Sequence, residues 1–419
     1  MNPSLIITPN AYKAGKLYSI VPTDGAGDLD VVRETNATRV NSNGLIETVG
    51  NNIPRLDYSN GSCPSILVEP QRTNLILQSE DFSDASWTSI ATVNTNTDVS
   101  PSGILNADTI TDGTTVYRDR RQTITITPNA TYTSSVFIKK TTGTLTSYPA
   151  LANVFSGVSN RAIYLGINTT TGELAYINAS SSPLPSSFSS SIQSYGDYWR
   201  VTLTTQDNQS NTTLLYFIYP ALSTDFIVGD TGATGSAVFW GAQLEVGTNA
   251  TSYIPTTTET VTRNSDIIRK TGISDLIGQT EGTIFCELID YTNSFGDFIF
   301  DLSDGTTNNS IRIGRLNGNR TQLLFTVNGS ITLNVVNTIS EIVEPIKKIV
   351  IGYIGNNISL YVNGVLIGTN TTSAIPNNLS VLNLGSRVNN TGILNGSIKE
   401  FFLIKTRLSN LQLTQLTTL

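Results

Sequence analysis

Acid–base chemistry in this chain depends on carboxylates, because the 419-residue sequence contains no histidine. That absence excludes a Ser-His-Asp triad, a Cys-His dyad and His-ligated zinc. A glycosidase would instead need two carboxylates about 5 to 9.5 Å apart. We predict no catalytic residue and interpret the carboxylates of one region as solvated turn groups, with catalysis as the alternative. That region supplies Glu287 and Asp290, followed by Asp297, Asp301 and Asp304 in FGDFIFDLSDG.

Sugar binding, by contrast, needs an open aromatic or polar face with fixed hydrogen-bonding groups. The two-residue period of GDYWRVTLT and FWGAQLEV places Trp199 and Trp240 on faces shared with aliphatic residues, which predicts that both are core residues. Four polar side chains take the opposite faces. If that side is open, they form a glycan-binding surface, and a merely solvated sheet surface is the alternative. The four residues are Tyr198, Arg200, Gln243 and Glu245.

The composition indicates strands and turns around these residues. Only 14% of the residues are charged, and Ser, Thr, Asn and Gly fill most polar positions. A net charge of -7 argues against nucleic acid as a partner. No apolar run approaches the length of about 18 residues that a membrane span needs. MNPSLIITPN does not resemble a signal peptide, so we expect a chain made in a cytoplasm. Cys63 and Cys286 are predicted to be separate buried thiols.

Three domains are predicted, all of them β. Residues 1–72 form a small turn-rich module, which includes a hairpin at Asn43-Gly44 and has too few apolar residues to bury a core alone. Residues 73–258 carry short strands at regular spacing, which indicates a jelly roll or β-sandwich. A polar linker from Thr256 to Asp266 leads to a second jelly roll at 270–419, which we expect to fold alone.

Three segments resemble bacteriophage virion fibre proteins of the head spike or head fibre domain family. They read ATRVNSNGLIETVGNNIPRLDY, CPSILVEPQRTNLILQSEDFSDASW and FWGAQLEVGTNATSYIPTT, and they occur in the family's order within the first 260 or so residues. The resemblance implies a virion-associated, trimeric appendage. The middle domain also resembles jelly-roll carbohydrate-binding modules.

The C-terminal part resembles the concanavalin A/laminin-G jelly roll. SLYVNGVLIG matches that family's hairpin, GSIKEFFL matches its last strand, and Ser409 is predicted to cap a terminal helix. The ExDxE strand of the family's hydrolases is missing. Some laminin-G domains bind Ca²⁺ through loop carboxylates, so the resemblance implies a calcium site at Asp301 or Asp304 as an alternative to no cofactor.

Together these observations predict a non-enzymatic structural fibre on the head or tail of a phage virion. Its expected role is adhesion to host-surface glycans, with many weak contacts multiplied by several copies. We expect a homotrimer that attaches to capsid or other virion proteins through residues 1–72. A glycan-cleaving depolymerase and a capsid decoration protein that binds no ligand are the alternatives.

Overall fold

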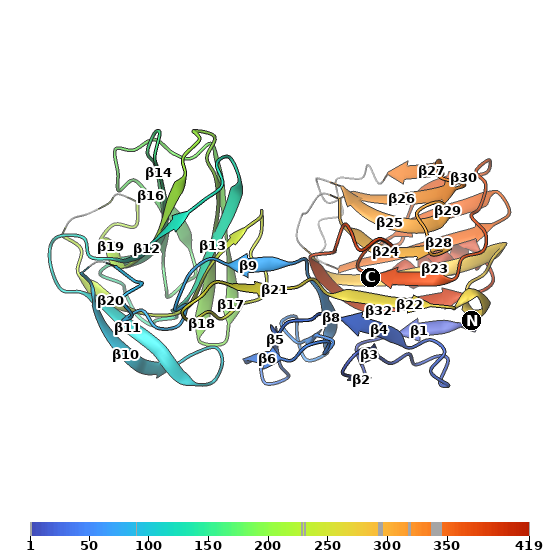
Figure 1. The fold of residues 1–419 in the computed structure, drawn as a ribbon, viewed down its shortest axis with the longest axis horizontal. Helices are drawn as coiled ribbons and strands as arrows, with labels where there is room; N and C mark the ends of the chain where they lie inside the picture. Colours follow the sequence, from blue (N-terminus) through green and yellow to red (C-terminus); the bar gives the residue numbers. More distant parts are fainter. Residues whose placement is uncertain are drawn as a thin grey trace. The chain divides into compact units, whose positions relative to one another are not determined.

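The computed structural model describes residues 2–418 apart from Ser89, Val228, Asp230, Thr231 and the segments 292–295, 317–319 and 337–345, and for residues 290, 291, 346 and 347 it describes the backbone alone. The chain divides into two compact units. Unit 1 comprises Met1–Ser42, Thr48–Gln71 and Asn264–Leu419, and unit 2 comprises Asn43–Glu47 and Arg72–Arg263. Both are built from strands, which confirms the predicted all-β fold class (Figure 1).

Unit 1 is a sandwich of two antiparallel sheets (Figure 1). Within the described residues, sheet A has eight strands and sheet B has nine. Sheet A runs, in spatial order, β30 (Val365–Asn370), β29 (Asn357–Val362), β28 (Ile346–Ile354), β23 (Glu281–Tyr291), β32 (Gly396–Ile404), β8 (Ser65–Val68) and β7 (Leu56–Asp57), with β1 (Leu5–Ile7) also paired to β32. Sheet B runs β2 (Tyr12–Lys13), β3 (Lys16–Leu17), β4 (Leu29–Val32), β22 (Ile267–Thr271), β31 (Val381–Leu384), β24 (Phe298–Ser303), β25 (Ser310–Leu316), β26 (Arg320–Val327) and β27 (Ser330–Val336).

The N-terminal strands complete the C-terminal sandwich. Strands β1 and β8 pair with β32, and β4 pairs with β22. Leu5, Val31 and Ile66 are buried in one core with Cys286 and Leu302. The predicted separate module at residues 1–72 is therefore wrong, because its apolar side chains find their burial in this shared core. For the same reason, residues 270–419 by themselves are an incomplete sandwich.

Unit 2 is a second antiparallel sandwich. Within the described residues, sheet C has six strands and sheet D has five. Sheet C runs β10 (Thr92–Val99), β11 (Leu105–Asp112), β20 (Gly235–Val246), β13 (Thr131–Lys139), β18 (Tyr198–Gln206) and β17 (Ser187–Tyr195). Sheet D runs β12 (Arg120–Thr125), β19 (Thr213–Ser223), β14 (Tyr148–Ser156), β15 (Arg161–Ile167) and β16 (Leu174–Ile177). Strand β9 (Arg72–Asn74) pairs with β21 (Val261–Arg263).

Local turn and cap signals identified several elements correctly. Asn363 and Gly364 both have positive φ (47° and 81°) in the tight turn between β29 and β30, where Asn and Gly are the favoured residues. A further hairpin joins β5 (Ala37–Val40) to β6 (Ile46–Val49), around the predicted Asn43-Gly44 turn. Ser409 caps α1 (Asn410–Thr417) in a capping box with Gln412, as predicted. A short 3₁₀ turn, η1 (Ser274–Leu276), precedes β23.

The segment predicted to be a polar linker, Thr256 to Asp266, is held at several points. Thr256 donates its hydroxyl to the carbonyl oxygen of Ile76 at 2.6 Å, and β21 is a paired strand. Asp266 accepts from Arg33 Nη1 at 2.9 Å and forms a second ion pair with Arg55. All three side chains of this ion cluster are buried. Polar groups of this predicted linker are buried, because hydrogen bonds and charge pairing compensate the cost of their burial.

Two further findings concern the cysteines and membrane crossing. Both cysteines are free thiols, as predicted, but Cys63 is exposed and only Cys286 is buried. Burial raises the pKa of the Cys286 thiol. Among the described residues, no helix is long and apolar enough to span a bilayer.

The ion cluster gives the first prediction. Asp266→Asn removes the carboxylate that neutralises two buried guanidinium groups, so unit 1 should lose about 3–5 kcal/mol of stability. Urea unfolding measures this loss. Lys16→Gln is the matched control, because it breaks the half-exposed Lys16–Asp30 pair and should cost at most about 1 kcal/mol. Equal losses of stability in the two variants would contradict the larger contribution expected from the buried ion cluster.

Candidate functional site

Strand β18 follows the predicted alternation. Val201 and Leu203 lie in the core between sheets C and D, and Trp199 packs against that core. Tyr198 and Arg200 take the opposite face, as the strand period requires. The assignment of faces in this strand is therefore confirmed.

Strand β20 departs from strict alternation at Gly241. This residue has a φ of 64°, and the register between β20 and β13 shifts next to it, which is a β-bulge. Phe239 lies in the core before the bulge and Leu244 lies there after it. Trp240 is consequently buried on the outer face of sheet C, where its ring lies 5.3 Å from that of Phe137. The predicted common face of Trp240 and Leu244 is wrong.

The predicted glycan-binding residues of β18 are covered. Tyr198 is 2% exposed and Arg200 is 6% exposed. The Tyr198 hydroxyl donates to the carbonyl oxygen of Val99 at 3.0 Å, and burial raises the pKa of this phenol. Arg200 donates to Ser135 Oγ at 3.1 Å and lies over the ring of Phe137. The expectation that these two side chains line an open surface is wrong.

The two predicted residues of β20 are fully buried by the segment that follows the strand. The backbone N–H of Ile254 donates to Gln243 Oε1 at 2.7 Å. The backbone N–H of Thr251 donates to Glu245 Oε2 at 2.9 Å, and the Thr251 hydroxyl donates to the other carboxylate oxygen. Residues 251–254 thus fold over this side of sheet C, so Gln243 and Glu245 anchor a loop and do not form an open face.

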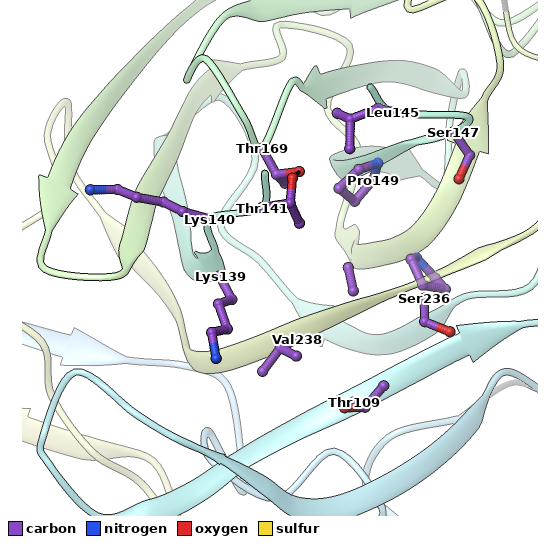
Figure 2. A pocket seen from close by; sticks show the side chains of 12 residues that line it. Thr109, Lys139, Lys140, Thr141, Leu145, Ser147, Pro149, Thr169, Ser236 and Val238 are labelled. Carbon is purple, nitrogen blue, oxygen red and sulfur yellow. Dashed lines mark hydrogen bonds between the residues drawn. The ribbon is translucent and has the colours of Figure 1, made fainter. Parts of the chain in front are cut away.

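A pocket of about 140 Å³ lies in unit 2, near the start of the β13–β14 connection (Figure 2). Figure 2 shows that the side chains of Lys139 and Lys140 point away from it. Lys139 pairs with Asp98, and Lys140 lies over the ring of Trp199. The remaining wall is mostly Thr, Ser, Pro and aliphatic. Its lining residues are Thr109, Lys139, Lys140, Thr141, Leu145, Ser147, Pro149, Thr169, Pro220, Ser236, Ala237 and Val238.

Asp301 and Asp304, the predicted calcium ligands, have different surroundings. Asp301 is buried in β24, accepts from the backbone N–H of Val388 at 3.0 Å, and has its pKa raised by burial to about 6. Asp304 is a turn carboxylate, as predicted, and accepts from Thr306 and from Asn309 Nδ2, each at 2.8 Å. The described residues contain no cluster of three or more acidic or cysteine side chains suited to a metal ion. Calcium binding stays a prediction.

The other carboxylates do not converge with Asp301. Glu287 lies on the outer face of sheet A and Asp301 on the outer face of sheet B, so the core of unit 1 separates them. Glu400 is the cross-strand neighbour of Glu287. Burial raises the pKa of Glu400, and the charge of Glu287 adds to this rise. Asp297 is buried, not a solvated turn group. The side chain of Asp290 lies outside the described part of the chain.

The outer face of sheet B carries a row of directly paired residues that are mostly polar. Directly paired residues of antiparallel strands project to the same side of a sheet. The row therefore places side chains from eight described strands on one face, including charges of both signs. In spatial order the row is Lys16, Asp30, Arg269, Asn383, Asp301, Arg312, Leu324 and Asn334.

One end of this row opens into a pocket of about 240 Å³, here named the sheet B hollow. Val32 and Ile267 give it an apolar wall, while Arg269 and Thr271 add polar groups from β22. Asp30 is ion-paired to Lys16. Arg269 makes no side-chain hydrogen bond or ion pair with any described residue. The hollow is lined by Asp30, Val32, Ile267, Arg269, Thr271 and Asn390.

Two more arginines lie farther along the same face. The guanidinium of Arg312 is 5.9 Å and that of Arg387 is 5.4 Å from the ring centre of Phe298. Burial lowers the pKa of Arg312, and the like charge of Arg387 lowers it further. The loop after β31 carries Arg387 and also supplies Asn390 to the hollow.

Residues 287–414 match the family model of the concanavalin A-like lectin/glucanases superfamily. The similarity expected for the C-terminal part of the chain is thereby confirmed. No curated protein matches the chain.

Solved structures match only loosely. The carbohydrate-binding module CBM40 of the Ruminococcus gnavus IT-sialidase is 15% identical over 34% of this chain and 85% of its own, with a TM-score of 0.30. Domain 4 of the arabinanase AbnA from Geobacillus stearothermophilus is 15% identical over 41% of this chain and 82% of its own, with a TM-score of 0.30. Similarity at this level carries no conclusion about what this chain does.

The hollow was not predicted from the sequence, because β22 falls across the boundary between the predicted linker, which ends at Asp266, and the predicted domain, which begins at residue 270. The signal was present in IIRKT, where Ile267, Arg269 and Thr271 alternate with Ile268 and Lys270. Finding Asp30 beside Arg269 required long-range pairing between β4 and β22, which no local pattern supplies.

The covered face of sheet C gives the second prediction. Gln243→Ala leaves the buried N–H of Ile254 without its acceptor, so unit 2 should lose about 1–3 kcal/mol of stability. Chemical unfolding measures the change. Gln193→Ala, at an exposed position of the edge strand β17, should stay within about 0.5 kcal/mol of the parent protein. An unchanged stability of Gln243→Ala would show that the loop over this face is not fixed as described.

Proposed function

We propose that the protein is a non-enzymatic fibre on the head or tail of a bacteriophage virion, where it binds host-surface glycans through the sheet B hollow. The observation that carries the binding proposal is the combination of groups in that hollow. Val32 and Ile267 offer apolar surface to the C–H groups of a sugar ring. Arg269, Thr271 and Asn390 offer hydrogen bonds to its hydroxyl groups.

The similarity of residues 287–414 to lectins and glucanases supports a saccharide as the ligand class. Strand β24 and the loop that bears Asn390 belong to this matched region, and β22 pairs with β31 inside it. The virion role rests on the sequence resemblance of the first 260 or so residues to phage fibre proteins. A chain of this kind is made in the cytoplasm of the host and attaches to capsid or other virion proteins.

A fibre compensates weak single contacts by repetition. A shallow site of this size gives modest affinity, and several copies on one particle raise the overall avidity without any new contact. The proposed fibre is a homotrimer, as the resemblance to phage fibre proteins implies. Within residues 1–72, Leu5, Val31 and Ile66 are among the apolar side chains that the core of unit 1 buries, so these side chains do not require a trimer for their burial.

The third prediction concerns assembly. Light scattering of the purified chain should give three times the 45.1 kDa chain mass. The mass should stay constant on dilution through the micromolar range if the trimer is a stable fibre. A monomer throughout that range would contradict a self-assembled trimer.

The fourth prediction tests the hollow. Thr271→Trp places a large side chain in the hollow from an exposed position of β22, so it should block glycan binding and leave the melting temperature unchanged. Binding of labelled protein to host cells and to a glycan array measures the effect. Thr371→Trp, at an exposed turn after β30, is the control and should bind like the parent protein. Full binding by Thr271→Trp would remove the hollow as the site.

Assays of glycan binding and glycan cleavage also distinguish the two alternative functions, a depolymerase and a decoration protein without a ligand. New reducing ends after incubation with a bound glycan would indicate a depolymerase, and Glu287→Gln would then test the adjacent carboxylates Glu287 and Glu400. A parent protein that binds neither host cells nor any arrayed glycan would favour a capsid decoration protein.

A further inference from the structure

The positive charge on the outer face of sheet B is not balanced by nearby carboxylates. Arg269, Arg312 and Arg387 project from this face or its covering loop, and none forms an ion pair with a described residue. Asp301 is the carboxylate whose charge interacts with Arg312 and Arg387, and its two neighbours in the row are Asn383 and Arg312. The second acidic residue of the row, Asp30, is neutralised by Lys16.

Two buried arginines elsewhere in unit 1, unlike these three, form ion pairs with carboxylates. Arg33 and Arg55 share the carboxylate of Asp266, and Arg55 also contacts Glu69 at 2.6 Å. Those guanidinium groups are therefore matched by acidic groups. A chain with a net charge of -7 has many carboxylates to pair with arginines. Three arginines that form no ion pair with any described residue, one of them in the wall of a hollow, indicate a place where a ligand supplies negative charge.

Guanidinium geometry narrows the chemistry of that ligand. Arginine presents parallel N–H donors that match the two oxygens of a carboxylate or sulfate. The side chain of Arg269 lines the hollow and has no hydrogen-bonding partner among the described residues. Arg387 precedes Asn390 in a loop where the N–H of Asn390 donates to the carbonyl oxygen of Arg387 at 2.9 Å. The hollow therefore has one arginine in its wall, and the loop that supplies Asn390 to the hollow carries another.

We propose that the sheet B hollow selects anionic saccharides, with the acidic group of the sugar bound by Arg269 and attracted by Arg387 and Arg312. This inference rests on the proposed glycan binding and adds the class of sugar. The apolar wall of Val32 and Ile267 takes the ring, and the arginine side of the hollow takes the carboxylate or sulfate.

Calorimetric titration of the full chain tests the inference. The ligands are an oligogalacturonate, its methyl ester, a sulfated dextran oligosaccharide of similar length, and maltohexaose as a neutral reference. The oligogalacturonate should bind at least about tenfold more tightly than its methyl ester, because a hydrogen bond to a charged group is lost on esterification. Added salt should weaken binding of the acid and leave the ester unaffected.

Single-residue variants test whether Arg269 and Arg387 bind the acidic group of the sugar. Arg269→Gln should weaken oligogalacturonate binding about tenfold, and Arg269→Lys should retain part of the affinity because the charge remains. Arg387→Gln should give a smaller loss. Lys405→Gln removes the same charge from an exposed position elsewhere in unit 1 and should change nothing. Melting temperatures of all variants show whether they are folded.

The outcomes are distinguishable. Equal binding of acid and ester, both blocked by Thr271→Trp, would overturn anionic selectivity and leave glycan binding in place. Equal weakening by Arg269→Gln and Lys405→Gln would also overturn it, because net charge alone would then explain the effect. Sulfated and carboxylated sugars that bind alike would support the shared anion chemistry. The absence of binding to all four ligands would overturn both the selectivity and the glycan site.

Discussion

The buried ion cluster around Asp266 is the interaction on which the organisation of unit 1 depends. Its carboxylate binds two arginines from the N-terminal part of the chain and also accepts the backbone N–H of Glu69 at 3.0 Å. Isolated buried charges are costly, so each of these groups requires the others in place. The cluster fixes residue 266 at the entry to β22, and β22 in turn joins β4 to β31. The hollow is built on that junction.

In unit 2, a single glycine determines which side chains of one strand face the core. The bulge at Gly241 reverses which side chains of β20 face the core, and it moves Trp240 to the outer face of sheet C. The space beside Gly241 is narrow, because an added Cβ would lie 3.0 Å from the ring of Phe137. Tight packing of Trp240, Phe137 and Tyr253 then leaves this face closed, with ring centroids of Trp240 and Tyr253 4.6 Å apart. The outer face of sheet C, which strict alternation would leave to solvent, is therefore packed and buried like a core.

The arginines of unit 1 differ in whether a carboxylate is paired with them, and the proposed ligand site uses those without an ion pair to a described residue. In the ion cluster, guanidinium and carboxylate groups are matched, so the cluster stabilises the fold and offers nothing to a partner. On sheet B, two guanidinium groups flank the ring of Phe298 and a third lines the hollow. Asp301, which burial keeps at a raised pKa of about 6, compensates only part of that charge. This positive charge, which the nearby carboxylate compensates only in part, is the basis of the proposed binding of an anionic ligand.

The sequence by itself determined the all-β class, the hairpin at Asn363-Gly364, the cap at Ser409 and the inward faces of β18, because each depends on residues adjacent in the chain. It also identified the lectin-like C-terminal part. Only the tertiary structure decided that residues 1–42 and 48–71 belong to the C-terminal sandwich, that residues 251–254 cover Gln243 and Glu245, and that Asp30 pairs with Arg269. Strand pairing across more than 200 residues follows from shared burial and charge compensation, and both of these depend on the whole chain. A two-residue period indicates only which side of its own strand a residue takes.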